Sequence, residues 1–260
     1  PMGPMTVAFG TIEQPLKFKD ERLYGCGLYV PFRNTAHHYV CLANGELGQQ
    51  VSLVKSPTSD MASRSNMLKH EIGPVTFDGM EVQDSALLPN ALSSDDLRLM
   101  GAAVRAQQMA GALQSMLNLS VDYAQGRQAF GRPIGKFQAV QQNLARLAGE
   151  TAAATAAAGS AADTIQHAER FDTAVILEVA AAKIRTGEAA TEGAAISHQV
   201  HGAMGYTSEH ILHMYTQRLF LWREDFGTET EWAVKLGSIV ALLYLLERSR
   251  YRKLLNYSMK

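Results

Sequence analysis

The spacing of apolar residues changes once along the chain, near residue 90. Before this point, short runs of β-branched and aromatic residues alternate with polar positions, as in "RLYGCGLYVPF" and "HHYVCLA". Turn-forming segments such as "ANGEL" and "SPTSD" separate these runs. Alternation with a period of two is typical of half-buried strands. Residues 1–90 are therefore predicted to form a small antiparallel β-domain.

From Ser93 onward the apolar residues recur at helical spacing. "SSDDL" offers a Ser cap and early acidic residues, which favour the start of a helix. Helices are predicted from there to about residue 127, and then over about 136–168, 172–200, 208–222 and 230–253. The run "GETAAATAAAGSAADT" contributes small side chains that let neighbouring helices approach closely. Residues 91–260 are therefore predicted to form an antiparallel four-helix bundle, and the fold class is α+β.

Composition and charge exclude several classes of protein. The formal net charge is −1 and no basic tract is present, which argues against nucleic acid or an anionic membrane as a partner. No apolar run approaches the ~20 residues that span a bilayer. Two cysteines provide neither a disulfide framework nor a metal cluster. A cytoplasmic globular protein without a membrane span is expected.

Two segments between predicted helices carry residue types suited to an anionic ligand. In "YAQGRQAFGRPIGKFQAVQQNLA", Arg127 can present a planar fork to a phosphate, Phe130 offers a flat apolar face, and Gln138 stands at a helix start. In "HQVHGAMGYTSEH", the backbone amides around Gly202 and Gly205 can cradle a pyrophosphate. A purely structural role as a turn between helices is the alternative for both segments.

The second segment also holds four histidines, His198, His201, His210 and His213. Their spacing matches no zinc signature, and no Ser or Cys partner with a third orienting group is evident. Helix caps or packing groups are the expected roles of these residues, and no metal site is predicted.

Taken together, these motifs resemble the acyl-CoA dehydrogenase family. "RQAFGRPIGKFQAVQQNLA" follows the family pattern R-x-x-F-G-x-x-I-x-x-F-Q, and "QVHGAMGYTSEHILHMY" is similar to the family's Q-x-x-G-G-x-G-Y segment. "VTFDGMEVQDSALLP" and "LYGCGLYVPFRNTAHHYVCLA" resemble strands of its middle β-domain. The resemblance implies a partial middle β-domain at 1–90, a C-terminal helical bundle at 91–260, and no counterpart of the family's N-terminal helical domain.

The resemblance also implies FAD as the cofactor and α,β-dehydrogenation of an acyl-CoA as the reaction. In the family a carboxylate takes the proton from Cα, FAD accepts the hydride from Cβ, and the electrons pass to an electron-transfer flavoprotein. The resemblance further implies a homo- or hetero-oligomer, either a dimer or a tetramer, in which one subunit contacts the FAD of its neighbour. By position, the implied cofactor contacts of this chain are Arg127, Phe130, Gln138, Gln199, Gly202, Gly205, Thr228 and Tyr29.

Three positions depart from the family pattern. The family's catalytic Glu usually precedes a Gly-Thr pair, and Phe226 stands there in "DFGT"; a phenyl ring cannot accept a proton. In a subset of the family the Glu comes from the helix before the R-x-x-F-G turn, where this chain has Gly101. Pro31 replaces a Thr whose hydroxyl bonds near the flavin N5, so a hydrogen-bond donor is lost.

The stretch "FLWREDFGTETEW" therefore has two interpretations. In the first, Glu224 or Asp225, which flank the base position, substitutes for the missing base. In the second, the stretch is a solvated turn, and Trp222 and Trp232 pack against the bundle. The second interpretation is favoured, because neighbouring helical positions point about 100° apart.

Three functions remain open for the chain. It is a subunit that lacks the usual base and supplies FAD contacts to a partner, or a self-sufficient dehydrogenase that uses Glu224 or Asp225, or a helical scaffold that binds no flavin. Intact cofactor positions beside a missing base favour the first. Arg98 and Arg105, which share a helix face, are expected to be solvated rather than to meet CoA phosphates.

Overall fold

The computed structural model describes residues 4–11, 13–56, 72–88 and 93–258; for Tyr29, Ile72, Ser94 and 246–258 it describes the backbone alone. The chain divides into two compact units, Pro1–Arg98 and Leu99–Lys260. The turn predicted at "SPTSD" (56–60) lies partly outside the described residues, and so does the boundary predicted near residue 90.

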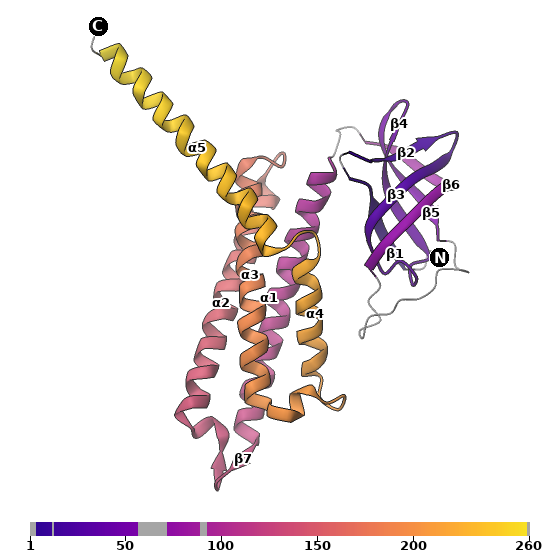
Figure 1. Cartoon of the computed structure of the whole chain (residues 1–260). Helices are drawn as coiled ribbons and strands as arrows, with labels where there is room; N and C mark the ends of the chain where they lie inside the picture. The colour runs from indigo at the N-terminus through magenta and orange to yellow at the C-terminus, as the bar shows by residue number, and fades with distance from the viewer. Residues whose placement is uncertain (1–3, 12, 57–71, 89–92, 259–260) are drawn as a thin grey trace. The chain divides into compact units, whose positions relative to one another are not determined.

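In its described residues, the first unit is a barrel-like sheet of six strands. They are β1 (Met5–Phe9), β2 (Leu16–Lys19), β3 (Arg22–Pro31), β4 (His38–Gly45), β5 (Gly48–Lys55) and β6 (Ile72–Leu87). β4 pairs with both β5 and β2, so that β4, β5, β6, β3 and β2 close a ring (Figure 1). Most pairs are antiparallel, as predicted, whereas β1–β4 and β2–β4 are parallel. The closed ring has five strands, which is an odd number, so neighbouring strands cannot all be antiparallel. At least one pair in the ring must therefore be parallel.

Side chains from facing strands fill the interior of this sheet. Leu23 and Val30 of β3, Tyr39 of β4 and Phe77 of β6 are buried. The rings of Tyr39 and Phe77 meet edge to face, with 5.8 Å between their centroids. The Tyr39 hydroxyl donates to the carbonyl oxygen of Arg33 at 2.6 Å, so its buried polar tip is paired. The β-branched and aromatic runs of the sequence thus form core strands, as predicted.

The second unit is helical. Its helices are α1 (Ser94–Gly126), α2 (Gln138–His167), α3 (Thr173–His201), α4 (Leu212–Glu224) and α5 (Glu229–Ser258). Figure 1 shows α1, α2, α3 and α4 running alongside one another. The predicted helices are confirmed, except that α4 begins later than expected. The segment before it is held in turns, because the Thr207 hydroxyl donates to the Met204 carbonyl and the His210 amide to the Thr207 carbonyl.

Small side chains let the helices of this unit pack closely. The buried positions of α2 recur every three or four residues: Leu147, Thr151, Ala154, Ala158 and Ala161. Ala158 and Ala161 join a core cluster that includes Ala102 and Ala106 of α1 and Ala182 of α3. The alanine-rich run is therefore a packing surface, as predicted, and the α+β fold class is confirmed. In the part of the chain that is described, no helix combines the length and apolar character needed to cross a membrane.

Candidate functional site

A tight hairpin connects α1 to α2 and exposes an aromatic ring. β7 (Gln128–Ala129) pairs with β8 (Arg132–Pro133), and Phe130 and Gly131 between them have φ angles of +52° and +76°. Positive φ at both central positions matches a two-residue hairpin turn but is unusual for phenylalanine. The Phe130 side chain is 96% exposed, and its ring lies edge-on to Phe137 at 6.2 Å. A strained, exposed aromatic residue at this tip is a candidate ligand contact.

Two glycines shape the connection between α3 and α4 in different ways. Gly202 has φ +61°, and nothing lies within 4 Å of the place that a Cβ would occupy, so its backbone is open. Gly205 belongs to the short helix η2 (Gly202–Tyr206) and is buried. A Cβ at Gly205 would lie 2.9 Å from Leu212 Cδ2 and 3.0 Å from His198 Nδ1. The first glycine therefore opens the backbone to a ligand, whereas the second allows close packing.

The two connections enclose an open pocket of about 720 Å³. Its walls come from the end of α1, the α1–α2 turn and the end of α3: Tyr123, Gly126, Arg127, Ile134, Gln199, Val200, His201, Gly202, Ala203 and Met204. The pocket brings together three of the predicted cofactor contacts, Arg127, Gln199 and Gly202. A guanidinium, a side-chain amide and open backbone on one wall suit an anionic ligand.

Four other predicted cofactor contacts, all in the helical unit, are not among the residues that line this pocket. Phe130 stands at the hairpin tip, Gln138 is the exposed first residue of α2, and Gly205 packs behind the pocket wall. Thr228 lies in another turn, between α4 and α5. Tyr29 belongs to β3, and its side chain lies outside the described part of the chain.

Tyr123 and His201 line the pocket, although neither was predicted to contact a ligand. Their rings pack at 4.5 Å, and His201 also lies 4.6 Å from the ring of His210. Tyr123 stands four residues before Arg127, and this spacing could have marked it as a neighbour on the same helix face. Among the described residues, no group of three or more metal-binding side chains is placed to hold an ion. These imidazoles instead pack against other rings.

The two sequence positions considered for the base meet at one place in the structure. Phe226, with φ +58°, lies in the turn after α4, and its ring occupies the space into which a side chain at Gly101 of α1 would project. A Cβ at Gly101 would lie 2.4 Å from Phe226 Cδ1. Trp232 is 2% exposed and donates from Nε1 to the Phe226 carbonyl at 3.1 Å, which confirms its predicted packing. A phenyl ring thus fills the space of either carboxylate.

The two carboxylates that flank Phe226 have different surroundings. Asp225 Oδ2 accepts a hydrogen bond from Arg105 Nε at 2.7 Å, and both side chains are about nine-tenths buried. The Arg105 guanidinium also lies 5.8 Å from the ring centroids of Trp222 and Phe226. The expectation that Arg105 is solvated was therefore wrong, because its ion-pair partner comes from a turn distant in sequence. Glu224 is exposed.

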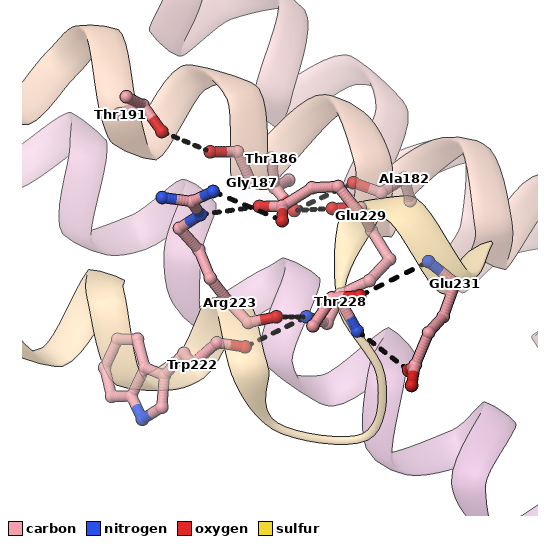
Figure 2. A network of polar contacts seen from close by, with 10 residues as sticks. Ala182, Thr186, Gly187, Thr191, Trp222, Arg223, Thr228, Glu229 and Glu231 are labelled. Atoms are coloured by element: carbon pink, nitrogen blue, oxygen red, sulfur yellow. Dashed lines mark hydrogen bonds and ion pairs between the residues drawn. The ribbon is translucent and has the colours of Figure 1, made fainter. Parts of the chain in front are cut away.

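A polar network fixes this turn to α3. Arg223 donates to both carboxylate oxygens of Glu229, at 2.6 and 3.3 Å (Figure 2). Lys183, fully buried in α3, donates to the carbonyls of Trp222 and Arg223 at 3.0 and 2.6 Å. Burial lowers the pKa of Lys183 to about 8, although Glu229 opposes this shift. Gly187 leaves the space that the Glu229 carboxylate occupies. The turn is packed and ion-paired, which corrects the expectation of a solvated turn.

Comparison with known proteins identifies the family. The profile described as "Acyl-CoA dehydrogenase, C-terminal domain" matches residues 99–228, half of the chain. Acyl-CoA dehydrogenase IpdE2 of Mycobacterium tuberculosis is 38% identical over 117 residues, which cover 45% of this chain and 34% of that protein. The human mitochondrial short-chain specific acyl-CoA dehydrogenase is 39% identical over 113 residues, or 42% of this chain and 26% of that protein. The matches thus span about a third or less of these relatives.

Solved structures show the same fold over most of the chain. The ChsE4-ChsE5 complex from Mycobacterium tuberculosis matches with a TM-score of 0.69 and 24% identity, covering 91% of this chain and 66% of that one. The glutaryl-CoA dehydrogenase of Mycobacterium smegmatis matches with a TM-score of 0.71 and 22% identity, covering 91% of this chain and 65% of that one. These neighbours include both the strand unit and the helical unit, so the motifs and the fold agree, and the chain belongs to the acyl-CoA dehydrogenase family.

Proposed function

We propose that this chain is a subunit of an FAD-dependent acyl-CoA dehydrogenase and that it supplies FAD contacts while a partner chain supplies the base. The observation that carries the proposal is the contrast between two sites within Leu99–Lys260. One is an open pocket walled by Arg127, Gln199 and Gly202. The other is the base position, which Phe226 fills against Gly101.

The residues of the pocket fit one part of FAD, its pyrophosphate. Arg127 is exposed at the end of α1, where its planar guanidinium can bind two phosphate oxygens at once. Gly202 presents backbone that no Cβ covers, and Gln199 adds a side-chain amide. Phe130, exposed on the hairpin, has a flat face that suits an aromatic ring of the cofactor.

The reaction divides between the cofactor and a base. When bound, FAD provides the acceptor for the hydride that leaves Cβ of the acyl-CoA. Removal of the Cα proton needs a free carboxylate, and this chain offers a poor choice. Phe226 has no basic atom, the Asp225 carboxylate is engaged by Arg105, and Glu224 is exposed to solvent. A partner carboxylate is therefore part of the proposal, as are electron-transfer flavoprotein as the electron acceptor and a hetero-oligomeric assembly.

The test is the visible absorption spectrum of the chain purified alone and after co-expression with the product of its neighbouring gene. Colourless protein that becomes yellow and active only with the partner is expected. Replacing Arg127 by Ala should reduce the flavin content of the complex, because the pyrophosphate loses its cation. Arg170→Ala, at an exposed position between α2 and α3, is the matched control and should retain flavin.

Two other results would reject the proposal. Flavin bound by the chain alone and bleached by an acyl-CoA would indicate a self-sufficient dehydrogenase that uses Glu224 or Asp225. Colourless protein under both conditions would indicate a scaffold without flavin.

A further inference from the structure

The lining of the pocket proposed to bind FAD carries less positive charge than the FAD pyrophosphate carries negative charge. Of the ten described residues that line it, Arg127 alone carries a permanent charge, and none is a carboxylate. The pyrophosphate of FAD is doubly negative near neutral pH, so one guanidinium leaves one negative charge unbalanced within this wall. Within this wall, further positive charge can come only from a side chain that gains a proton, and His201 is the only imidazole among these lining residues.

The hydrogen bonds of His201 define which of its nitrogens can gain that proton. Nδ1 lies 2.8 Å from the Ser197 carbonyl oxygen, which can only accept, so Nδ1 carries the hydrogen. In the neutral ring Nε2 therefore holds a lone pair. It is buried and makes no hydrogen bond in this structure, and the Leu119 carbonyl is an acceptor that favours the protonated ring. The side chain as a whole is 3% exposed. A ring nitrogen that makes no hydrogen bond, on a residue that lines the pocket, can accept a proton.

The neighbouring imidazole of His210 is less suited to this role. Its Nδ1 accepts a hydrogen bond from the Leu212 amide at 3.1 Å, so its hydrogen is on Nε2. Protonating Nδ1 would break that bond and set two N–H groups against each other. His201 has no such obstacle, because the carbonyls of Ser197 and Leu119 both favour its charged form.

The groups around His201 keep it neutral while the pocket lacks an anion. Burial lowers the pKa of His201 below its ordinary value, and His210 lowers it further, whereas the two carbonyls act in the opposite direction. The titratable rings that face it are Tyr123 of α1 and His210 of the connection before α4. His198, on α3 itself, stacks on Tyr206, and its own pKa is lowered by burial, by His201 and by His213. No carboxylate is among the groups that shift either imidazole.

We propose that His201 is a further binding residue of this site, which takes up a proton at Nε2 as an anionic dinucleotide binds and so supplies the second positive charge. The inference rests on the proposed function, because it assumes that the pocket receives the FAD pyrophosphate. Binding and proton uptake are then linked: the anion raises the pKa of His201, and protonation strengthens binding. The affinity for FAD rises as the pH falls between the bound-state pKa and the free-state pKa of His201.

Calorimetric titration of FAD into the flavin-stripped complex tests this linkage. The titration is repeated in buffers of different ionisation enthalpy. The slope of the observed binding enthalpy against the buffer's ionisation enthalpy gives the number of protons taken up. Wild-type protein should take up a fraction of one proton near neutral pH. Its affinity should rise by up to about tenfold per pH unit within the linked range. His201→Asn should show a slope of zero and little pH dependence, while its amide can still donate to the Ser197 carbonyl.

Two further measurements separate proton linkage from loss of structure. His167→Asn, at an exposed position near the end of α2, should keep the wild-type slope. The ring resonances of His201 in the wild-type complex should titrate at a higher pH with FAD than without it, a readout that needs no variant. FAD binding without proton uptake, or uptake that survives in His201→Asn, would overturn the inference but leave the proposed function standing. A complex that binds no FAD at any pH would overturn both.

Discussion

Gly101 and Phe226 fit each other as a pair. A glycine inside a helix destabilises it by roughly 0.5–1 kcal/mol relative to alanine, so its presence in α1 calls for a packing reason. That reason is the Phe226 ring, whose Cδ1 would lie 2.4 Å from a Cβ at position 101. Phe226 also packs against the core cluster that contains Ala102 and Trp232. The Phe226 ring therefore fills the position at which the family resemblance expects a carboxylate.

Gly101→Ala should destabilise the fold by roughly 1–3 kcal/mol, because the new methyl group overlaps a ring that its core neighbours hold in place. Urea unfolding measures the change. Gly111→Ala is the matched control: it lies on the same helix with nothing within 4 Å of its Cβ position, and it should stabilise slightly. In a Phe226→Ala background, Gly101→Ala should become neutral or stabilising. An equal loss of stability from Gly101→Ala with and without the Phe226 ring would show that the two residues are not coupled.

The helices and strands were largely predictable, because their signals are local. The buried positions of α2 recur at helical spacing within the sequence itself. The parallel pairing of β2 with β4 was not predictable, since it follows from closure of the ring and not from either strand. In the candidate site, the segments around Arg127 and Gly202 could be predicted, because each carries a local sequence motif. The contact between Arg105 and Asp225 joins α1 to a distant turn, so no local pattern reveals it.

Lys183 links α3 to the end of α4 and provides a pH-dependent test of that link. Its pKa of about 8 in the folded chain lies below the ordinary 10.5. Between these values the unfolded chain keeps a proton that the folded chain has lost, so this residue makes the free energy of unfolding rise with pH. Below pH 8 both states are protonated, and its contribution is constant.

Lys183→Met should abolish this rise, which amounts to roughly 3 kcal/mol across the whole window. Urea unfolding of both proteins at pH 8 and pH 10.5 measures the difference between them. Lys136→Met removes an exposed lysine and should leave the wild-type pH dependence intact. Parallel pH profiles for Lys183→Met and wild type would show that the buried amine does not titrate in this range.

At the scale of the whole molecule, two places in Leu99–Lys260 contrast in how open they are. The pocket of Arg127, Gln199 and Gly202 is open, whereas the base position is closed by Phe226. The ion pair between Arg105 and Asp225 then has a structural role, because it anchors the turn to α1. The proposed division of the site between two chains would explain both features, since this chain would then need only the geometry that holds the cofactor.

Division of the site predicts that neither flanking carboxylate matters for turnover in the complex. Glu224→Gln should leave kcat per bound FAD within about twofold of wild type, because the proposal assigns the base to the partner chain. Asp225→Asn should lower the thermal stability, since Arg105 loses a buried partner, but should also preserve kcat per bound FAD. Stopped-flow reduction of the flavin by an acyl-CoA, normalised to flavin content, measures the chemical step. Loss of a general base reduces a rate by about a hundredfold or more. A loss of that size with flavin retained, in either variant, would assign the base to this chain and reject the partner's role.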